Sequence, residues 1–375
     1  MPKVVHIITE LRVGGAENAL HKIILHSDRD AFDYVVISLE DKGVFGEPIK
    51  SLGVPVYTLN MNPARPNPLA LLSLIRILRR EKPDIIHLWL YHAILAGTLA
   101  SFFVPNHALG WNIRNATIKN FGSGSRRLIF NLCARLSGRA DFIVTNTKAG
   151  ERLHIDEGYR DGHWHILYNG FELDRFQPDT GTRDRMRAEL GLSEDASVIG
   201  MVGRLTPEKN YPGFISAALK LLETHADVYF VAVGKDVTFN SLGDRIPQDK
   251  QNRFRLLDMR RDIPDLLNAF DLFTLTSDFE GFPNVVGEAM ATGLPVAVTN
   301  AGDTAHLVGD AGIVVPTGDM DAMVAAWARL IAMSPQGRAA MGASARERII
   351  EQFSVEKFTE QYASLYQKIL TEKQA

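Results

Sequence analysis

Residues 198–210 read Val198-Ile-Gly-Met-Val-Gly203-Arg204-Leu-Thr-Pro-Glu-Lys209-Asn210, an apolar run that ends in a short polar loop. A helix-length segment follows, and a second apolar run rich in β-branched residues begins at Val228. Continuous apolar strands that alternate with helices are typical of parallel sheets covered on both faces. The stretch therefore predicts an α/β, doubly wound fold for this part of the chain.

The same alternation runs through the whole chain in two series. The predicted strands are residues 4–9, 34–39, 56–59, 85–89, 109–113, 142–145 and 165–168, then 198–203, 228–233, 254–257, 272–275, 295–298 and 312–315. An Asn169-Gly170 turn and a polar stretch that ends at Pro178 separate the two series. We therefore predict domains at 1–170 and 171–353. Residues 354–375 form a last helix with an apolar stripe that packs on another part of the chain.

Composition excludes several classes of protein. With 375 residues, 46% of them hydrophobic and 23% charged, the chain is neither disordered nor fibrous. A net charge of −3 gives no reason to expect a nucleic-acid partner, and one cysteine excludes a disulfide framework. Residues 85–113 lack Asp, Glu, Lys and Arg, but His, Pro and Asn interrupt them. We predict a strand, an apolar helix over residues 93–103 and a second strand there instead of a membrane span.

Charge is divided unevenly between the two predicted domains. Residues 1–170 carry a net charge of +5 and residues 171–375 a net charge of −8. Part of the basic excess lies in 126–139, where Leu128, Leu132, Ile129 and Leu136 are expected on one helical face. Such a helix is either an ordinary surface helix with a core stripe or one that contacts an anionic bilayer. We expect a cytoplasmic protein, either free or peripheral at the inner face of the cytoplasmic membrane.

Two loops at predicted strand ends are suited to an anion. Gly14 and Gly15 follow the first strand and open a helix, although a tight turn explains them equally well. They match neither the dinucleotide nor the P-loop pattern, so NAD and ATP chemistry are not supported. Arg204 and Lys209 follow the strand 198–203, where two cations suit a diphosphate. Pairing with nearby carboxylates is the competing interpretation.

A third motif lies at Glu280-Gly-Phe-Pro-Asn-Val-Val-Gly-Glu288-Ala-Met290. Gly281 and Pro283 prevent a helix before about Asn284, so Glu280 lies in a loop and Glu288 on the helix. Two carboxylates beside a helix N-terminus can bind hydroxyl groups while the helix end holds phosphates. A capping carboxylate and an unrelated surface glutamate would produce the same spacing.

These motifs together resemble the retaining nucleotide-sugar glycosyltransferases of group 1, family 4. The resemblance covers nearly the whole chain and includes 14–17, 168–176, 203–210, 280–290, 293–296 and 315–319. It implies the GT-B fold, with an acceptor domain first, a donor domain second and a last helix that returns to the first domain. The two Rossmann-like domains of that fold face a central cleft.

The resemblance also implies roles for individual residues. Arg204 and Lys209 would bind the donor diphosphate and stabilise its charge, Glu280 would contact the transferred sugar, and Glu288 would hold the ribose. The remaining donor-binding positions are Gly15, Gly281, Phe282, Pro283, Asn284 and Val285 around the phosphates and sugar, and Leu257 near the base. No metal is required, because the cations and the helix end stabilise the leaving group.

One position departs from the family pattern. Many relatives carry a histidine where this chain has Arg114, within the stretch Trp111-Asn-Ile-Arg-Asn115. Arginine cannot act as a base, so Arg114 is expected to act through hydrogen bonds or not at all. His87 and His92 lie near another strand end, where contact with the acceptor competes with a core or surface role. The stretches at residues 88–93 and 111–115 resemble those of a bacterial subgroup that assembles cell-surface polysaccharide.

The resemblance leads to one expected activity and two alternatives. We expect a retaining transferase that moves a sugar from a UDP- or GDP-sugar to a lipid-linked or oligosaccharide acceptor by metal-independent front-face substitution. The basic first domain would then face an anionic membrane surface. The alternatives are a nucleotide-sugar 2-epimerase of the same fold and a non-catalytic nucleotide-sugar-binding protein.

Overall fold

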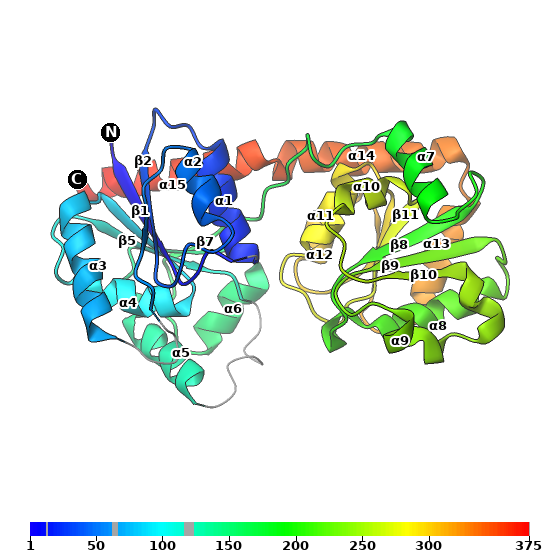
Figure 1. The fold of residues 1–375 in the computed structure, drawn as a ribbon, viewed down its shortest axis with the longest axis horizontal. Helices are drawn as coiled ribbons and strands as arrows, with labels where there is room; N and C mark the ends of the chain where they lie inside the picture. The colour runs from blue at the N-terminus through cyan, green and yellow to red at the C-terminus, as the bar shows by residue number, and fades with distance from the viewer. Residues whose placement is uncertain (13, 62–66, 116–123, 375) are drawn as a thin grey trace. The chain divides into compact units, whose positions relative to one another are not determined.

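The computed structural model describes residues 1–12, 14–61, 67–115 and 124–374. The chain divides into two compact units (Figure 1). Unit 1 comprises Met1–Gly170 and Val355–Ala375, and unit 2 comprises Phe171–Ser354. The last helix therefore belongs to the same unit as the N-terminal half of the chain.

Unit 1 is built on a seven-stranded parallel sheet in the order β3-β2-β1-β4-β5-β6-β7. Its strands are β1 Lys3–Ile8, β2 Asp33–Ser38, β3 Val56–Thr58, β4 Ile85–Trp89, β5 Ala108–Ile113, β6 Phe142–Thr145 and β7 Trp164–Ile166. Strand order reverses between β1 and β4, and the carboxyl ends at such a switch point form a binding crevice in open α/β sheets.

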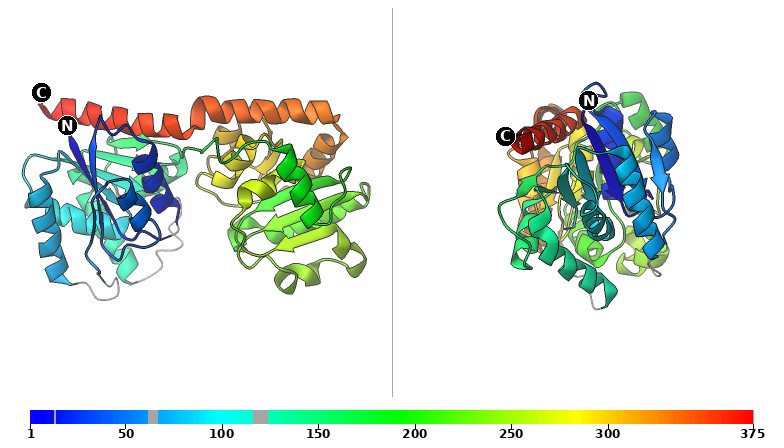
Figure 2. Two further views of the ribbon diagram at one scale, coloured as in Figure 1. Left: turned by 45° about the horizontal axis from the view of Figure 1, so that its top comes forward. Right: turned by 90° about the vertical axis from the view of Figure 1, so that its left-hand side faces the viewer.

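Helices cover both faces of this sheet. The helices are α1 Gly15–His26, α2 Gly46–Ser51, α3 Pro68–Glu81, α4 Tyr91–Ser101, α5 Ser125–Leu136, the 3-10 turn η2 Ser137–Arg139, α6 Lys148–Asp156 and α15 Val355–Gln374. One core packs α3, α4 and α5 on the sheet, and the other packs α1, α2 and α15. Helix α15 lies along unit 1 (red in Figures 1 and 2) and buries Phe358, Tyr362 and Tyr366.

Unit 2 repeats this plan with a six-stranded parallel sheet in the order β10-β9-β8-β11-β12-β13. Its strands are β8 Ser197–Val202, β9 Val228–Val233, β10 Phe254–Leu257, β11 Leu272–Leu275, β12 Val296–Thr299 and β13 Ile313–Val315. Its α-helices are α7 Thr180–Glu189, α8 Tyr211–Leu222, α9 Phe239–Leu242, α10 Ile263–Asn268, α11 Asn284–Ala291, α12 Thr304–Val308, α13 Met320–Ala332 and α14 Pro335–Phe353. Three 3-10 turns are η3 Pro207–Lys209, η4 Gly243–Arg245 and η5 Gln248–Arg253. The switch point lies between β8 and β11.

The structure confirms the predicted doubly wound fold and corrects two details. The apolar helix predicted over 93–103 is α4, which begins and ends two residues earlier. On α5 the predicted stripe is wrong at Leu128, which is 60% exposed, because Phe130 and Cys133 instead face the core. None of the helices within the described residues combines the length and apolarity that a bilayer span needs.

Three buried histidines make unit 1 sensitive to acid. Burial lowers the pKa of His6 to about 3 and that of His154 to about 4, and it lowers the pKa of His87 well below its usual value. The unfolded chain binds protons on these rings near pH 6.5, whereas the folded chain does not. The stability that these neutral histidines contribute to unit 1 is therefore fully present above pH 6.5, and it is lost as the pH falls toward the folded pKa values.

We expect unit 1 to lose about 2 kcal/mol of stability per buried histidine between pH 7.5 and pH 5. In unit 2, His225 is half-buried and His306 exposed, so its stability should change much less. Urea titrations followed by ¹⁹F NMR of fluorotryptophan-labelled protein separate the units, since Trp89, Trp111 and Trp164 lie in unit 1 and Trp327 lies in unit 2. Equal losses at all four signals would contradict the prediction.

Candidate functional site

The sequence motifs of unit 2 meet at its topological switch point. Strands β8 and β11 are direct neighbours, with Leu272 opposite Ile199. Their carboxyl ends lead into the loop that carries Arg204 and Lys209 and the loop that carries Glu280. Since ligands of open α/β sheets bind where strand order reverses, the topology places these side chains at the expected position.

Lys209 and Glu280 form an ion pair across these two loops. Lys209 Nζ donates to Glu280 Oε1 at 2.5 Å, and both side chains are mostly buried. Arg204 is exposed, and its guanidinium has no hydrogen-bond or ion-pair partner among the described residues. The competing interpretation, cations paired with carboxylates, thus describes Lys209 but not Arg204. An unpaired guanidinium beside a fixed ammonium is suited to bind a phosphate group.

The Glu280–Glu288 motif adopts the predicted loop and helix. Helix α11 begins at Asn284, directly after Pro283, so Glu280 precedes it and Glu288 lies on it. The Phe282 ring is buried and stacks on Phe171 at 6.2 Å between ring centroids. Phe282 therefore fills the core, and only its backbone is left to face a ligand.

The remaining donor-side positions surround this centre. Asn284 and Val285 are the first two residues of α11 and are half-buried, while Gly281 and Pro283 precede them in the loop. The Leu257 carbonyl, at the end of β10, accepts a hydrogen bond from Gly234 N at 3.1 Å. That carbonyl is thus already engaged, which leaves the neighbouring backbone groups of 256–259 to contact a base.

In unit 1, Gly15 begins α1 at the carboxyl end of β1. A Cβ added at Gly15 would meet no protein atom within 4 Å. The packing of the chain itself therefore does not require glycine there. The open space is consistent with the close approach of an external group to the backbone.

Arg114 is held by three protein partners within unit 1. Its guanidinium donates to Asn112 Oδ1 and to Asn169 Oδ1, and to the Tyr362 hydroxyl at 2.9 Å. It also lies 5.3 Å from the centroid of the Trp89 ring. Arg114 thus links the end of β5 to α15 and to Asn169, which lies close to the end of the first segment of unit 1. These contacts describe an anchor, and the two remaining N–H groups are what it can offer a substrate.

The two histidines considered for acceptor contact differ in burial. His87 is fully buried in β4, and its Nδ1 lies 2.7 Å from the Tyr366 hydroxyl. It is a core residue. His92 lies near the start of α4 and is half-buried, and burial lowers its pKa. Of the two, only His92 retains exposed surface that a substrate can reach.

Two residues at strand ends were not singled out from the sequence. Ser277, after β11, is fully buried and donates its hydroxyl to Glu280 Oε1 at 2.6 Å. Leu90, at the switch point of unit 1, has a φ of 68° and a ψ of 154°. Such a backbone is strained for a residue with a side chain, and strain of this kind clusters at functional sites. The one signal that the sequence offered for Ser277 was its position as a polar residue between a predicted strand and the motif that begins at Glu280.

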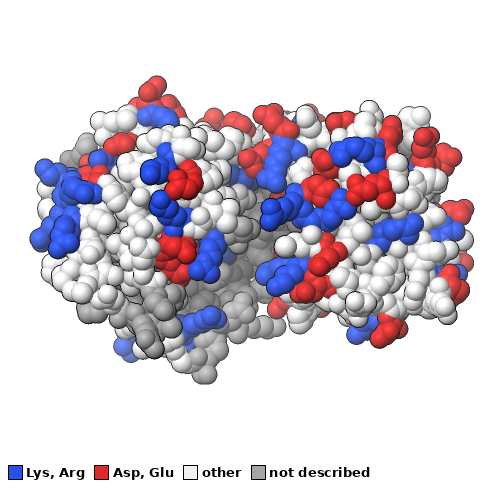
Figure 3. Space-filling model, in the orientation of Figure 1, with Lys and Arg blue, Asp and Glu red and all other residues white. Residues whose placement is uncertain are grey.

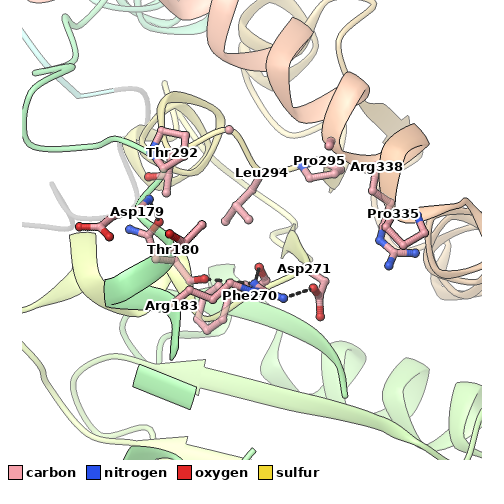
Figure 4. Close-up of a pocket in the computed structure, with 14 residues that line it drawn as sticks. Asp179, Thr180, Arg183, Phe270, Asp271, Thr292, Leu294, Pro295, Pro335 and Arg338 are labelled. Carbon is pink, nitrogen blue, oxygen red and sulfur yellow. Dashed lines mark hydrogen bonds and ion pairs between the residues drawn. The ribbon is translucent and has the colours of Figure 1, made fainter. Parts of the chain in front are cut away.

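A pocket at the opposite end of the unit 2 sheet is structural in character (Figure 4). It has a volume of about 290 Å³ and is lined by Asp271 and Pro295, which precede β11 and β12. Arg183 donates to Asp271 at 2.6 Å, and the buried Arg187 donates to the same carboxylate. The Asp271 carboxylate is therefore already engaged by two arginines, and it lies at the opposite end of the strands from Arg204 and Glu280.

The described residues contain no group of three or more His, Cys, Asp or Glu side chains placed to hold a metal ion.

Two Rossmann-like units with cations and carboxylates at one strand edge define a glycosyltransferase of the GT-B class. Models of two families match the chain: "Glycosyltransferase Family 4" over residues 13–175 and "Glycosyl transferases group 1" over residues 196–333. The chain belongs to the group 1, family 4 glycosyltransferases.

Two relatives align with most of this chain and over most of their own length. The chain is 28% identical over 312 residues to a UDP-Gal:alpha-D-GlcNAc-diphosphoundecaprenol alpha-1,3-galactosyltransferase of Escherichia coli, covering 81% of this chain and 80% of that protein. It is 29% identical to the lipopolysaccharide core biosynthesis mannosyltransferase LpsB of Rhizobium meliloti, covering 76% and 84%.

Solved structures confirm the fold. Anabaena Alr3699/HepE in complex with UDP superposes with a TM-score of 0.83 at 24% identity, covering 98% of this chain and all of that one. A glycosyltransferase from Rickettsia africae superposes with a TM-score of 0.80 at 16% identity, covering 98% and 99%.

Proposed function

We propose that this enzyme transfers a sugar from a nucleoside-diphosphate sugar, with a UDP-sugar as the first candidate, to a lipid-linked glycan acceptor during cell-surface polysaccharide synthesis. The observation that carries the proposal is the pairing of Lys209 with Glu280 beside the unpaired Arg204 at the β8–β11 switch point. The names of the Escherichia coli and Rhizobium relatives support a bacterial glycan as the acceptor. The name of the Escherichia coli relative includes a sugar that is linked through a diphosphate to a lipid. The Anabaena complex supports uracil as the base.

In this proposal, two cations and two carboxylates contact different parts of the donor. Arg204 and Lys209 bind the diphosphate and stabilise the charge that develops as the sugar–phosphate bond breaks. Glu280 accepts hydrogen bonds from hydroxyl groups of the transferred sugar, and Glu288 on α11 accepts hydrogen bonds from those of the ribose. The backbone N–H groups that begin α11, at Asn284 and Val285, add a partial positive charge for the phosphates.

We infer a front-face substitution that retains the anomeric configuration. The bond between the anomeric carbon and the diphosphate oxygen breaks, and the acceptor oxygen bonds to that carbon from the same side. The acceptor proton passes to the departing diphosphate oxygen, so no side chain need act as base. The enzyme contributes positioning and charge stabilisation, and the cations perform the role that a metal would otherwise have. A glycosyl adduct trapped on a side chain would contradict this route.

The proposal is tested by the release of free nucleotide from UDP-, GDP- and ADP-sugars with EDTA present. We expect slow hydrolysis of one donor, and faster turnover once a lipid-diphosphate saccharide is added. Substitution Arg204→Gln should lower turnover at least tenfold, because it removes the charge that the diphosphate meets. Binding of a nucleotide sugar with no turnover, even with acceptor, would indicate a binding protein, and inversion of the donor sugar without acceptor an epimerase.

A face of unit 1 supports the membrane as a further partner. Helices α3, α4 and α5 pack on one side of the sheet and together contain six arginines and one acid, Glu81. Glu81 is engaged by Lys3 and Tyr57. Lys and Arg side chains gather over α3 at the left of Figure 3. The face is therefore strongly basic.

Exposed apolar side chains interleave with these arginines. Phe102 and Phe103, after α4, are 53% and 52% exposed. Arg139 lies 4.7 Å from the Phe102 ring centroid, and Arg79 donates to the Phe103 carbonyl at 2.9 Å. Cationic groups around exposed apolar residues match the headgroup and acyl boundary of an anionic bilayer.

We expect the double substitution Arg76→Gln and Arg135→Gln to weaken binding to anionic vesicles about 30-fold. Both arginines are exposed on this face, and each is worth about 1 kcal/mol near an anionic surface. Co-flotation with phosphatidylglycerol vesicles measures the effect. Lys50→Gln with Arg329→Gln removes the same charge elsewhere and should bind like wild type. Wild-type protein that stays with the soluble fraction would refute membrane binding.

A further inference from the structure

The loop that follows β11 is hydrogen-bonded to the loop that carries Lys209. Thr276 Oγ1 donates to the carbonyls of Lys209 at 3.2 Å and of Asn210 at 3.3 Å. Asp278 N donates to the Glu208 carbonyl at 2.9 Å, and Asn210 Nδ2 donates to Asp278 Oδ1 at 3.1 Å. The backbone on both sides of the Lys209–Glu280 pair is therefore joined by contacts that involve neither charged group.

Asn210 is specialised for this junction. Its φ of 50° lies in the left-handed region, which asparagine tolerates better than most residues. Its Oδ1 accepts from Gly213 N and so caps α8, while its Nδ2 reaches Asp278. One side chain thus ties the start of α8 to the β11 loop.

Ser277 occupies the centre of the junction and contacts the pair directly. Its hydroxyl donates to Glu280 Oε1 at 2.6 Å, the same oxygen that accepts from Lys209. Its carbonyl accepts from Thr299 Oγ1 at 2.6 Å, and the residue is fully buried. Glu280 Oε2 has no protein hydrogen-bond partner among the described residues. The carboxylate is therefore held through one oxygen and leaves the other available.

We propose that Ser277 is a positioning residue that fixes Oε1 of Glu280 against Lys209 and thereby presents Oε2 to a hydroxyl of the transferred sugar. The inference rests on the proposed function, since it names what orients the sugar-contacting carboxylate. An ion pair alone does not choose between two equivalent carboxylate oxygens, whereas a buried hydroxyl with a fixed backbone does. Ser277 acts through Glu280 and does not itself touch the donor.

The test compares sugar recognition with nucleotide recognition. We expect Ser277→Ala to lower donor turnover at least tenfold and to weaken binding of UDP-galactose, or of the sugar nucleotide that the donor panel selects. Binding of UDP, which carries no sugar, should stay within threefold of wild type by calorimetry. In a Glu280→Ala background, the same substitution should change sugar-nucleotide binding less than twofold.

A matched control separates positioning from loosening of the loop. Thr299→Val removes the buried bond to the Ser277 carbonyl but keeps the Ser277 hydroxyl, and its turnover should stay within threefold of wild type. If Ser277→Ala does not fold, Ser277→Cys is the alternative, because its thiol is of similar size but a much weaker hydrogen-bond donor, and it should show the same selective loss.

The outcomes distinguish the two proposals. Turnover of Ser277→Ala within threefold of wild type, or equal losses for UDP and the sugar nucleotide, overturns the role of Ser277 alone. A wild-type protein that neither binds nor turns over any nucleotide sugar overturns the proposed function and this inference together.

Discussion

Substitution Lys209→Ala should lower kcat/KM for the donor about 10²- to 10³-fold, and Glu280→Ala should lower it by a similar factor. For Lys209, which faces the departing diphosphate, loss of one preorganised charge contact to a developing oxyanion costs about 2.7–4 kcal/mol in comparable sites. The two side chains share a 2.5 Å ion pair, so each substitution also releases its partner from position. The kcat/KM of the double variant should therefore be at least tenfold higher than the value expected if the losses of the two single variants simply multiplied.

Initial rates of nucleotide release give the four values of this double-mutant cycle. Lys220→Ala is the control, because Lys220 donates to Asp321 at 2.8 Å in an exposed ion pair of the same chemistry. We expect its kcat/KM within twofold of wild type. Strictly additive losses for Lys209 and Glu280 would mean that the pair does not act as a unit.

Gly302→Ala should lower activity at least 10²-fold although Gly302 bears no functional group. Its φ of 59° is left-handed, and an added Cβ would lie 2.2 Å from the Glu280 carbonyl oxygen and 2.6 Å from that of Gly281. Both obstacles are backbone atoms, so the loop that carries Glu280 must move. A displacement of about 1 Å at a reacting group costs on the order of 10²-fold in rate.

Gly318→Ala is the matched control for this substitution. Gly318 has a φ of 77°, but a Cβ there would meet nothing within 4 Å. Both variants incur the cost of a left-handed alanine, about 1–2 kcal/mol of stability, and only Gly302→Ala should also lose activity. Thermal melts and nucleotide release separate the two effects. Equal activity of the two variants would show that the Glu280 loop tolerates the shift.

Much of the fold follows from local pattern. Each of the thirteen predicted strands lies within two residues of a strand in the structure, because buried parallel strands are nearly continuous apolar runs. The start of α11 at Asn284 follows from Pro283 and Gly281, which act on their own backbone. Such features depend on neighbours in sequence and need no knowledge of the rest of the chain.

The apolar periodicity of the sequence predicts less reliably which face of a helix packs against the core. Leu128 was expected in an apolar stripe but is 60% exposed, because the core contact of α5 is made by Phe130 and Cys133. Periodicity identifies an amphipathic helix, but the rotation of its face depends on α4 beside it.

What the sequence by itself determined is where the strands lie along the chain, their division into two series, and the motifs that place Arg204, Lys209 and Glu280 after strands and Glu288 on a helix. The tertiary structure decided which of them meet: Lys209 pairs with Glu280 across 71 residues of chain, and Arg114 reaches Tyr362 across 248. Strand order brought Lys209 and Glu280 together, since β8 and β11 are neighbours only in the folded sheet. A hydrogen bond depends on distance and direction in space, and local sequence encodes neither for residues so far apart.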